Sequence, residues 1–207
     1  MKQLTLKFLC LLLSALFILH SKTHAQDLFE SKQFGIKMSK PQNWIGATNT
    51  DLQNNLDKVK FTDDELQKIL NSNKGILTLS TYYKYKIDSV AGLIPTIKVT
   101  IRANPTTTMA DFKQVMEAST DRVKTVVKNF EFIENFKEVN VSGFPSLYYN
   151  CRYSLTLANG DNMKVRNRYY MIPKGAYFIS ISLMDNETKE DCTQVLDKFI
   201  KSLQLTK

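Results

Sequence analysis

The chain has almost no histidine. Its 207 residues include two, His20 and His24, and both lie close to the N-terminus. Catalytic sites of the Ser-His-Asp and Cys-His types need an imidazole base, so a chain that loses its N-terminal segment on export cannot build one. Zinc would have to be held by two cysteines and carboxylates, which is a poor ligand set. The sequence therefore predicts no catalytic residue, no metal and no cofactor.

The chain also lacks a long apolar run. The longest, residues 8–19, is shorter than the roughly 20 residues that span a bilayer. Basic residues precede this run and a short polar segment ending in Ala25 follows it, which is the pattern of a secretory signal peptide cleaved after Ala25. Cys10 lies inside the run, too early for a lipid-anchored start. We expect a secreted or periplasmic mature chain, residues 26–207, with no retained membrane span and no nucleic-acid partner.

Basic residues exceed acidic ones, 28 against 20. Cleavage would remove Lys2, Lys7 and Lys22 and leave 25 against 20, a net charge of +5. The remaining charges are spread along the chain, which is typical of a solvated surface and attracts anionic partners only weakly.

Glycine and proline are scarce, with seven and five residues. No Pro-, Gly- or Ser-rich linker divides the chain, and no segment repeats. The mature length is typical of one unit with a full hydrophobic core. We expect a single domain over residues 26–207.

The sequence of the first third of the mature chain predicts a strand, a turn and a helix. Residues 34–38 alternate as a strand, and the segment from Pro41 to Trp44 turns the chain. A weak helical pattern covers residues 49–60. A firmer helix follows the capping box of Thr62 and Glu65 and ends at Gly75.

The middle of the chain predicts two antiparallel strands, a helix and a third strand. Residues 76–86 alternate so that Leu79 and Tyr83 share one face, and residues 97–101 form the next strand. Apolar residues at three-and-four spacing predict a helix over 109–129, and a strand follows over 130–141.

The C-terminal third organises the fold. Three alternating runs, residues 147–157, 164–172 and 177–183, predict strands that bury one face. One amphipathic helix then closes the chain with a matching apolar stripe. The stripe consists of Cys192, Val195, Leu196, Phe199, Ile200 and Leu203. The fold class is therefore α+β.

Side chains alternate between the two faces of a strand, and this alternation determines the length of the loop between the first two of these strands. A two-residue Asn159-Gly160 turn would oppose Cys151 to Arg168, whereas a three-residue loop with Gly160 left-handed keeps one apolar face. The second register pairs Leu147 with Met171, Tyr149 with Tyr169 and Tyr153 with Val165.

The same register brings a basic and aromatic row together on the other face. The guanidinium groups of arginine and the rings of tyrosine could bind an acidic partner or a glycan there. The alternative is that a second helix covers this face and the arginines only reach its rim. The candidate binding residues are Arg152, Lys164, Arg166, Arg168, Tyr148 and Tyr170, with Phe178 beside them.

Two cysteines remain after cleavage, Cys151 on a strand and Cys192 on the closing helix. Their patterns place both in one core between sheet and helix. An exported setting permits a disulfide between them, and two buried inert thiols are the alternative.

In this order, the chain resembles a superfamily that includes the PsbP-like extrinsic subunits of photosystem II, a Ran-GTPase-binding nuclear import factor and bacterial DcrB-like envelope proteins. The resemblance is carried by Gly35-Ile36-Lys37-Met38 with Pro41-Gln42-Asn43-Trp44, by Val141-Ser142-Gly143-Phe144-Pro145-Ser146, by Tyr169-Tyr170 with Gly175-Ala176-Tyr177-Phe178-Ile179, and by a helix ending in Ser202-Leu203. It implies an α/β/α sandwich with a central antiparallel sheet. It implies no shared chemistry, because members bind different partners.

The favoured hypothesis is an exported, non-catalytic accessory domain that binds another envelope protein. The second is a carrier of a small or apolar ligand, held between the sheet and a mobile helix formed by residues 49–60. The third is a hydrolase that uses carboxylates alone, for which Asp63, Asp64 and Glu65 are an acidic cluster. That cluster is better explained by the preference of helix N-termini for acids.

Overall fold

The computed structural model describes residues 28–48, 62–87, 89–90, 92–156, 160–187 and 189–206. The expected signal peptide and the expected weak helix over 49–60 lie outside the described residues.

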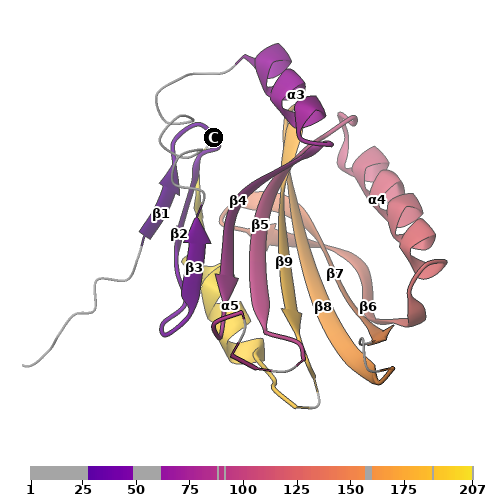
Figure 1. Ribbon diagram of the computed structural model, residues 1–207. Helices are drawn as coiled ribbons and strands as arrows, with labels where there is room; N and C mark the ends of the chain where they lie inside the picture. The colour runs from indigo at the N-terminus through magenta and orange to yellow at the C-terminus, as the bar shows by residue number, and fades with distance from the viewer. Residues whose placement is uncertain are drawn as a thin grey trace, which may run out of the picture.

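A seven-stranded antiparallel sheet forms the centre of the molecule (Figure 1). Its strands lie in the order β3-β4-β5-β9-β8-β7-β6. Their bounds are β3 Ile45–Thr48, β4 Ile76–Tyr83, β5 Thr96–Ala103, β6 Lys128–Val141, β7 Phe144–Thr156, β8 Asn162–Lys174 and β9 Tyr177–Asp185. A small sheet of β1 (Leu28–Ser31), β2 (Ile36–Ser39) and β10 (Gln204–Leu205) joins the two ends of the described chain.

Helices pack on both faces of the central sheet, so the expected α+β sandwich is confirmed (Figure 1). One face carries the larger core, to which α3 (Asp63–Ser72) contributes Leu66 and α5 (Thr193–Ser202) contributes Leu196. The opposite face carries a smaller, aromatic cluster under α4 (Met109–Lys124), centred on Phe112. No helix in the described ranges is long and apolar enough to cross a membrane.

The capping box of α3 forms as predicted. The backbone N–H of Glu65 donates to Thr62 Oγ1 at 3.3 Å, and the backbone N–H of Thr62 donates to Glu65 Oε2 at 2.8 Å. Each satisfies a backbone donor that the first helical turn leaves open. The hydrogen bonds of Glu65 therefore explain, in structural terms, why this acid lies in the first turn of α3.

The central helix is shorter than the sequence predicts. The apolar spacing continues through Val126 and Val127, but α4 ends at Lys124 and β6 begins at Lys128. Val126 is 81% exposed, so nothing holds a further helical turn against the sheet.

A bulge in β4 changes which tyrosine is buried. Between Thr78 and Ser80 the register against β5 shifts and leaves Leu79 without a partner. One extra residue inverts the alternation of every residue after it. Tyr82 therefore points into the larger core, and the expectation that Tyr83 shares the buried face with Leu79 is wrong.

The register between β7 and β8 is the predicted one. Leu147 opposes Met171, Tyr149 opposes Tyr169, and Gly160 has a φ of 88°. The neighbouring edge strand β6 is less regular, because its pairing with β7 shifts register at three places between Lys128 and Lys137.

The bulge predicts a difference between two adjacent tyrosines. Tyr82→Ala removes a ring that is 3% exposed and lies 5.8 Å from the ring of Phe199, so we expect the free energy of unfolding to fall by about 3 kcal/mol. Tyr83→Ala on the other face should cost about 1 kcal/mol or less. Urea unfolding of both variants measures the two losses. Equal losses, or a larger one for Tyr83, would contradict the position of the bulge.

Candidate binding site

The predicted basic row lies on the sheet face that α5 covers. In the β7–β8 pair, Arg152 opposes Arg166 and Asn150 opposes Arg168. Residues that oppose one another in an antiparallel pair project from the same face, so the sequence grouped these arginines correctly.

Arg166 is buried and bound to two carboxylates. Its Nε donates to Asp185 Oδ1 at 2.8 Å, its Nη2 donates to Asp185 Oδ2 at 2.6 Å, and the same Nη2 donates to Asp191 Oδ1 at 2.6 Å. Asp185 is 0% exposed and also accepts the backbone N–H of Cys192 at 2.9 Å. A carboxylate removed from water needs such partners, so Arg166 neutralises a charge within the fold.

Arg168 is buried beside it and holds the beginning of α5. Its Nη2 donates to Thr193 Oγ1 at 2.6 Å, and its Nη1 lies 3.8 Å from Asp185 Oδ2. The backbone N–H of Thr193 donates to Asp191 Oδ1 at 2.8 Å. Hydrogen bonds from the hydroxyl and backbone of Thr193, and then the hydrogen bond from Arg166, hold the pKa of Asp191 below its usual range.

The expectation of one exposed basic row therefore needs correction. Arg166 and Arg168 are buried and bound to groups of the same chain, because a helix covers this face as the alternative hypothesis stated. Two members of the row remain at the rim. Arg152 lies 3.5 Å from Glu187 through Nη2, and Lys164 is exposed.

The aromatic members separate onto two faces. Tyr148 and Tyr170 lie together on the α5 face with ring centroids 4.8 Å apart. Tyr148 donates to Glu134 Oε1 at 3.0 Å, and burial, reinforced by this bond, raises the pKa of its phenol. Phe178 lies on the opposite face, 5.2 Å from the ring of Phe112, because the β8–β9 register turns it away from the tyrosines.

The two cysteines lie on opposite faces of the sheet. Cys151 belongs to the aromatic cluster under α4, whereas Cys192 belongs to the larger core beside α5, so the expectation of a shared core is wrong. Both thiols are free and buried, and no disulfide joins them. Burial raises the pKa of Cys151 to about 12 and also raises the pKa of Cys192. Neutral thiols of this kind are unreactive.

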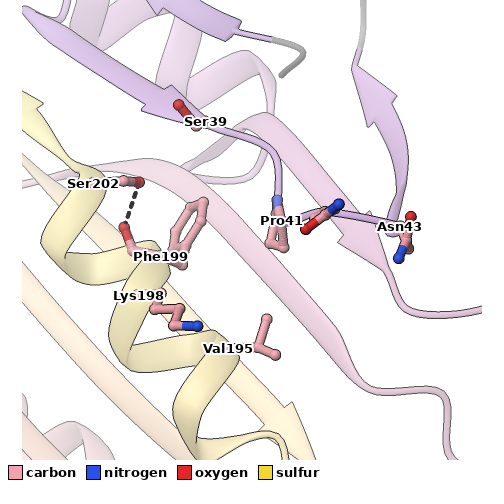
Figure 2. A pocket seen from close by; sticks show the side chains of 8 residues that line it. Ser39, Pro41, Asn43, Val195, Lys198, Phe199 and Ser202 are labelled. Carbon is pink, nitrogen blue, oxygen red and sulfur yellow. Dashed lines mark hydrogen bonds between the residues drawn. The ribbon is translucent and has the colours of Figure 1, made fainter. Parts of the chain in front are cut away.

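A cleft opens between the turn that follows β2 and one side of α5 (Figure 2). Its volume is about 310 Å³. The lining residues are Ser39, Pro41, Gln42, Asn43, Val195, Lys198, Phe199 and Ser202. Residues from the start and the end of the described chain thus form one site, which none of the predicted binding residues reaches.

Two elements shape the cleft. The backbone N–H of Trp44 donates to the carbonyl of Pro41 at 3.1 Å and closes the turn, in which Asn43 has a φ of 63°. Asparagine is one of the few residues that occupies this left-handed region readily. On the other side, Val195, Lys198 and Ser202 recur at helical spacing beside the buried stripe of α5.

The cleft combines an apolar floor with polar groups at its mouth. Pro41 and Phe199 are buried, whereas Gln42, Asn43 and Lys198 are exposed. Amides that can donate and accept hydrogen bonds therefore surround an apolar surface, with a cation at one side. Such an arrangement suits an amphipathic group.

No group of three His, Cys, Asp or Glu side chains that could hold a metal ion occurs within the described part of the chain.

No protein-family model matches the sequence, and no curated protein matches it. Solved structures do match. The chain is similar to cyanobacterial PsbP (CyanoP) from Synechocystis sp. PCC 6803, with a TM-score of 0.50, 15% identity, and coverage of 90% of this chain and 96% of that chain. The fold is PsbP-like.

Two further structures share the arrangement at lower similarity. One is the Ran-binding protein Mog1p of Saccharomyces cerevisiae, with a TM-score of 0.47, 12% identity, and coverage of 87% of this chain and 95% of that chain. The other is LpqN of Mycobacterium tuberculosis, which is involved in cell envelope biogenesis, with a TM-score of 0.47, 12% identity, and coverage of 90% and 88%. The match to cyanobacterial PsbP confirms the resemblance expected from the sequence as a resemblance of fold, and a fold does not determine function.

The first prediction from this site concerns the buried ion pairs. Asp185→Asn leaves Arg166 and Arg168 buried without their shared carboxylate, and we expect the free energy of unfolding to fall by about 3 to 5 kcal/mol. The matched control is Glu131→Gln, because Glu131 is an exposed carboxylate 3.9 Å from Arg152, and its loss should cost less than about 1 kcal/mol. Chemical denaturation measures both. A similar small loss for Asp185→Asn would show that the buried pairs contribute little.

The second concerns the thiols. We expect Cys151 and Cys192 to resist alkylation by iodoacetamide in the native protein and to react fully after unfolding without a reductant, because both are buried and free. Mass spectrometry of the labelled peptides reads out each cysteine separately. Labelling that requires prior reduction would contradict free thiols.

Proposed function

We propose that the chain is an exported, non-catalytic accessory domain that binds another protein of the cell envelope, and that the cleft beside α5 receives a short segment of that partner. The observation that carries this proposal is the open cleft of about 310 Å³, with an apolar floor and exposed amides at its mouth. The pattern of a signal peptide in residues 1–25 supports export.

A protein segment fits the cleft better than a carried small molecule does. Small-molecule sites enclose most of the surface of their ligand, typically in volumes of roughly 300 to 1,000 Å³. This cleft is at the lower end of that range, and three of its lining side chains are exposed. It has room for one or two side chains of a partner, while Gln42 and Asn43 can bond to the backbone of the same segment.

The single cation gives the partner segment a preferred chemistry. Lys198 is exposed at the mouth and has no ion pair with another described residue. An acidic residue next to the apolar one would therefore find a charge partner there, which favours recognition and orientation.

This proposal predicts that three substitutions at the mouth weaken capture of the partner. We expect the combination Gln42→Ala, Asn43→Gly and Lys198→Ala to weaken binding by roughly tenfold or more. Glycine is chosen at position 43 because it keeps the left-handed backbone while it removes the amide. The measurement is affinity capture from a detergent extract of the native envelope, followed by the dissociation constant of the purified partner.

The control is Lys201→Ala, which removes an exposed lysine of α5 outside the cleft and should leave capture unchanged. Equal capture of the partner by the triple variant would place the binding surface elsewhere. If native mass spectrometry of the purified protein finds a bound small molecule and no protein is captured, the carrier hypothesis replaces this one.

A further inference from the structure

Several connections meet at one end of the central sheet. The described part of the β4–β5 loop, the paired ends of β7 and β8, and the short α4–β6 connection lie there, because Thr96 opposes Met184, Thr156 opposes Asn162 and Lys128 opposes Ser154. Figure 1 shows the ends of β4, β7 and β8 in the lower half of the view, with the α4–β6 connection at the lower right. The backbone N–H of Leu93 lies 3.2 Å from Met163 Sδ, so the β4–β5 loop contacts the beginning of β8. We call this region the loop end.

The loop end concentrates exposed aliphatic side chains. Eight large hydrophobic residues are exposed among the described residues, and six of them lie at this end. They are Ile45 (45%), Ile87 (59%), Val90 (43%), Val123 (46%), Val126 (81%) and Leu155 (37%). Single exposed aliphatic residues are ordinary, but their gathering at one end of the sheet marks an interaction surface.

The loop end has exposed basic side chains that form no ion pair with another described residue. Its described acidic side chains are bound within the chain, as in the pairs Asp121–Lys124, Glu190–Lys84 and Asp191–Arg166. Five exposed basic side chains at the same end have no ion pair with another residue of the described ranges. They are Lys86, Arg122, Lys128, Lys164 and Lys189. Among the described residues, the free charges around the aliphatic side chains are therefore positive.

We propose that the loop end docks on an anionic lipid surface. The exposed aliphatic side chains of the loop end enter the boundary between headgroups and acyl chains, and the unpaired lysines bind the anionic headgroups. This inference is independent of the cleft, since none of these residues lines it.

The composition of the loop end favours lipid over an acidic protein. Protein interfaces depend on aromatic and Arg anchors seated in pockets. Here the exposed apolar residues are Val, Ile and Leu, three on connections and three near the ends of β3, α4 and β7, and all six are exposed to solvent. Lysines around projecting aliphatic residues match a surface of acyl chains under anionic headgroups.

Vesicle cosedimentation tests the proposal. The protein is taken as its host processes it, with the N-terminus determined by mass spectrometry, and is mixed with vesicles of phosphatidylcholine alone or with about one third phosphatidylglycerol. We expect binding to the anionic vesicles only. Lys86→Gln, Lys128→Gln and Lys164→Gln together should weaken it roughly a hundredfold, because each lysine near an anionic surface contributes roughly fivefold.

Two further variants make the result specific. Ile87→Ser with Val126→Ser should also weaken vesicle binding, whereas the control Lys32→Gln, Lys68→Gln and Lys201→Gln, which removes three exposed lysines away from the loop end, should not. All variants share one N-terminus, so any contribution of that segment cancels. Absence of binding to anionic vesicles, or binding that the loop-end variants leave unchanged, would overturn the proposal. Capture of an envelope protein in detergent is measured separately, so either proposal can fail alone.

Discussion

The buried carboxylate of Asp185 holds three elements of the fold at one point. It ends β9, it binds both buried arginines of β8, and it accepts the backbone N–H that precedes α5. An ion removed from water costs several kcal/mol, and this cost is offset only while all these partners stay in place. The position of α5 follows from this arrangement. That helix in turn covers the larger core with Leu196 and Phe199 and provides one wall of the cleft.

The two faces of the sheet have different chemistry. The α5 face contains the ion pairs and most of the aliphatic core, whereas the α4 face contains an aromatic cluster of Phe and Tyr side chains in edge-on and stacked contacts. The proposed protein site and the proposed lipid-docking end share no residue. The domain could therefore rest on a membrane through its loops while the cleft beside α5 stays open to a partner.

Much of the architecture could be predicted from local pattern. The hairpin register followed from the parity of the strands around Gly160, and the start of α3 followed from Thr62 and Glu65. The errors arose where tertiary packing decides. The bulge at Leu79 cannot be recognised from the sequence of a strand that mixes Leu, Thr and Tyr. The apolar stripe of α5 does not indicate which face of the sheet the helix covers, so the sequence does not show that Cys192 and Cys151 lie on opposite faces. The cleft was missed because its turn and its helix are far apart in the chain, although both elements were predicted.

The irregular pairing of β6 affects how this domain can associate. A long strand at the edge of a sheet offers a row of free backbone donors and acceptors to any extended chain. In β6 the register against β7 shifts at three places, and the strand contains charged residues such as Glu131, Glu138 and Lys137. Shifts of this kind bend the strand and break the even spacing that a new neighbour needs. Growth of the sheet by strand addition at this edge is therefore disfavoured, and two copies of the protein do not readily join through their β6 strands.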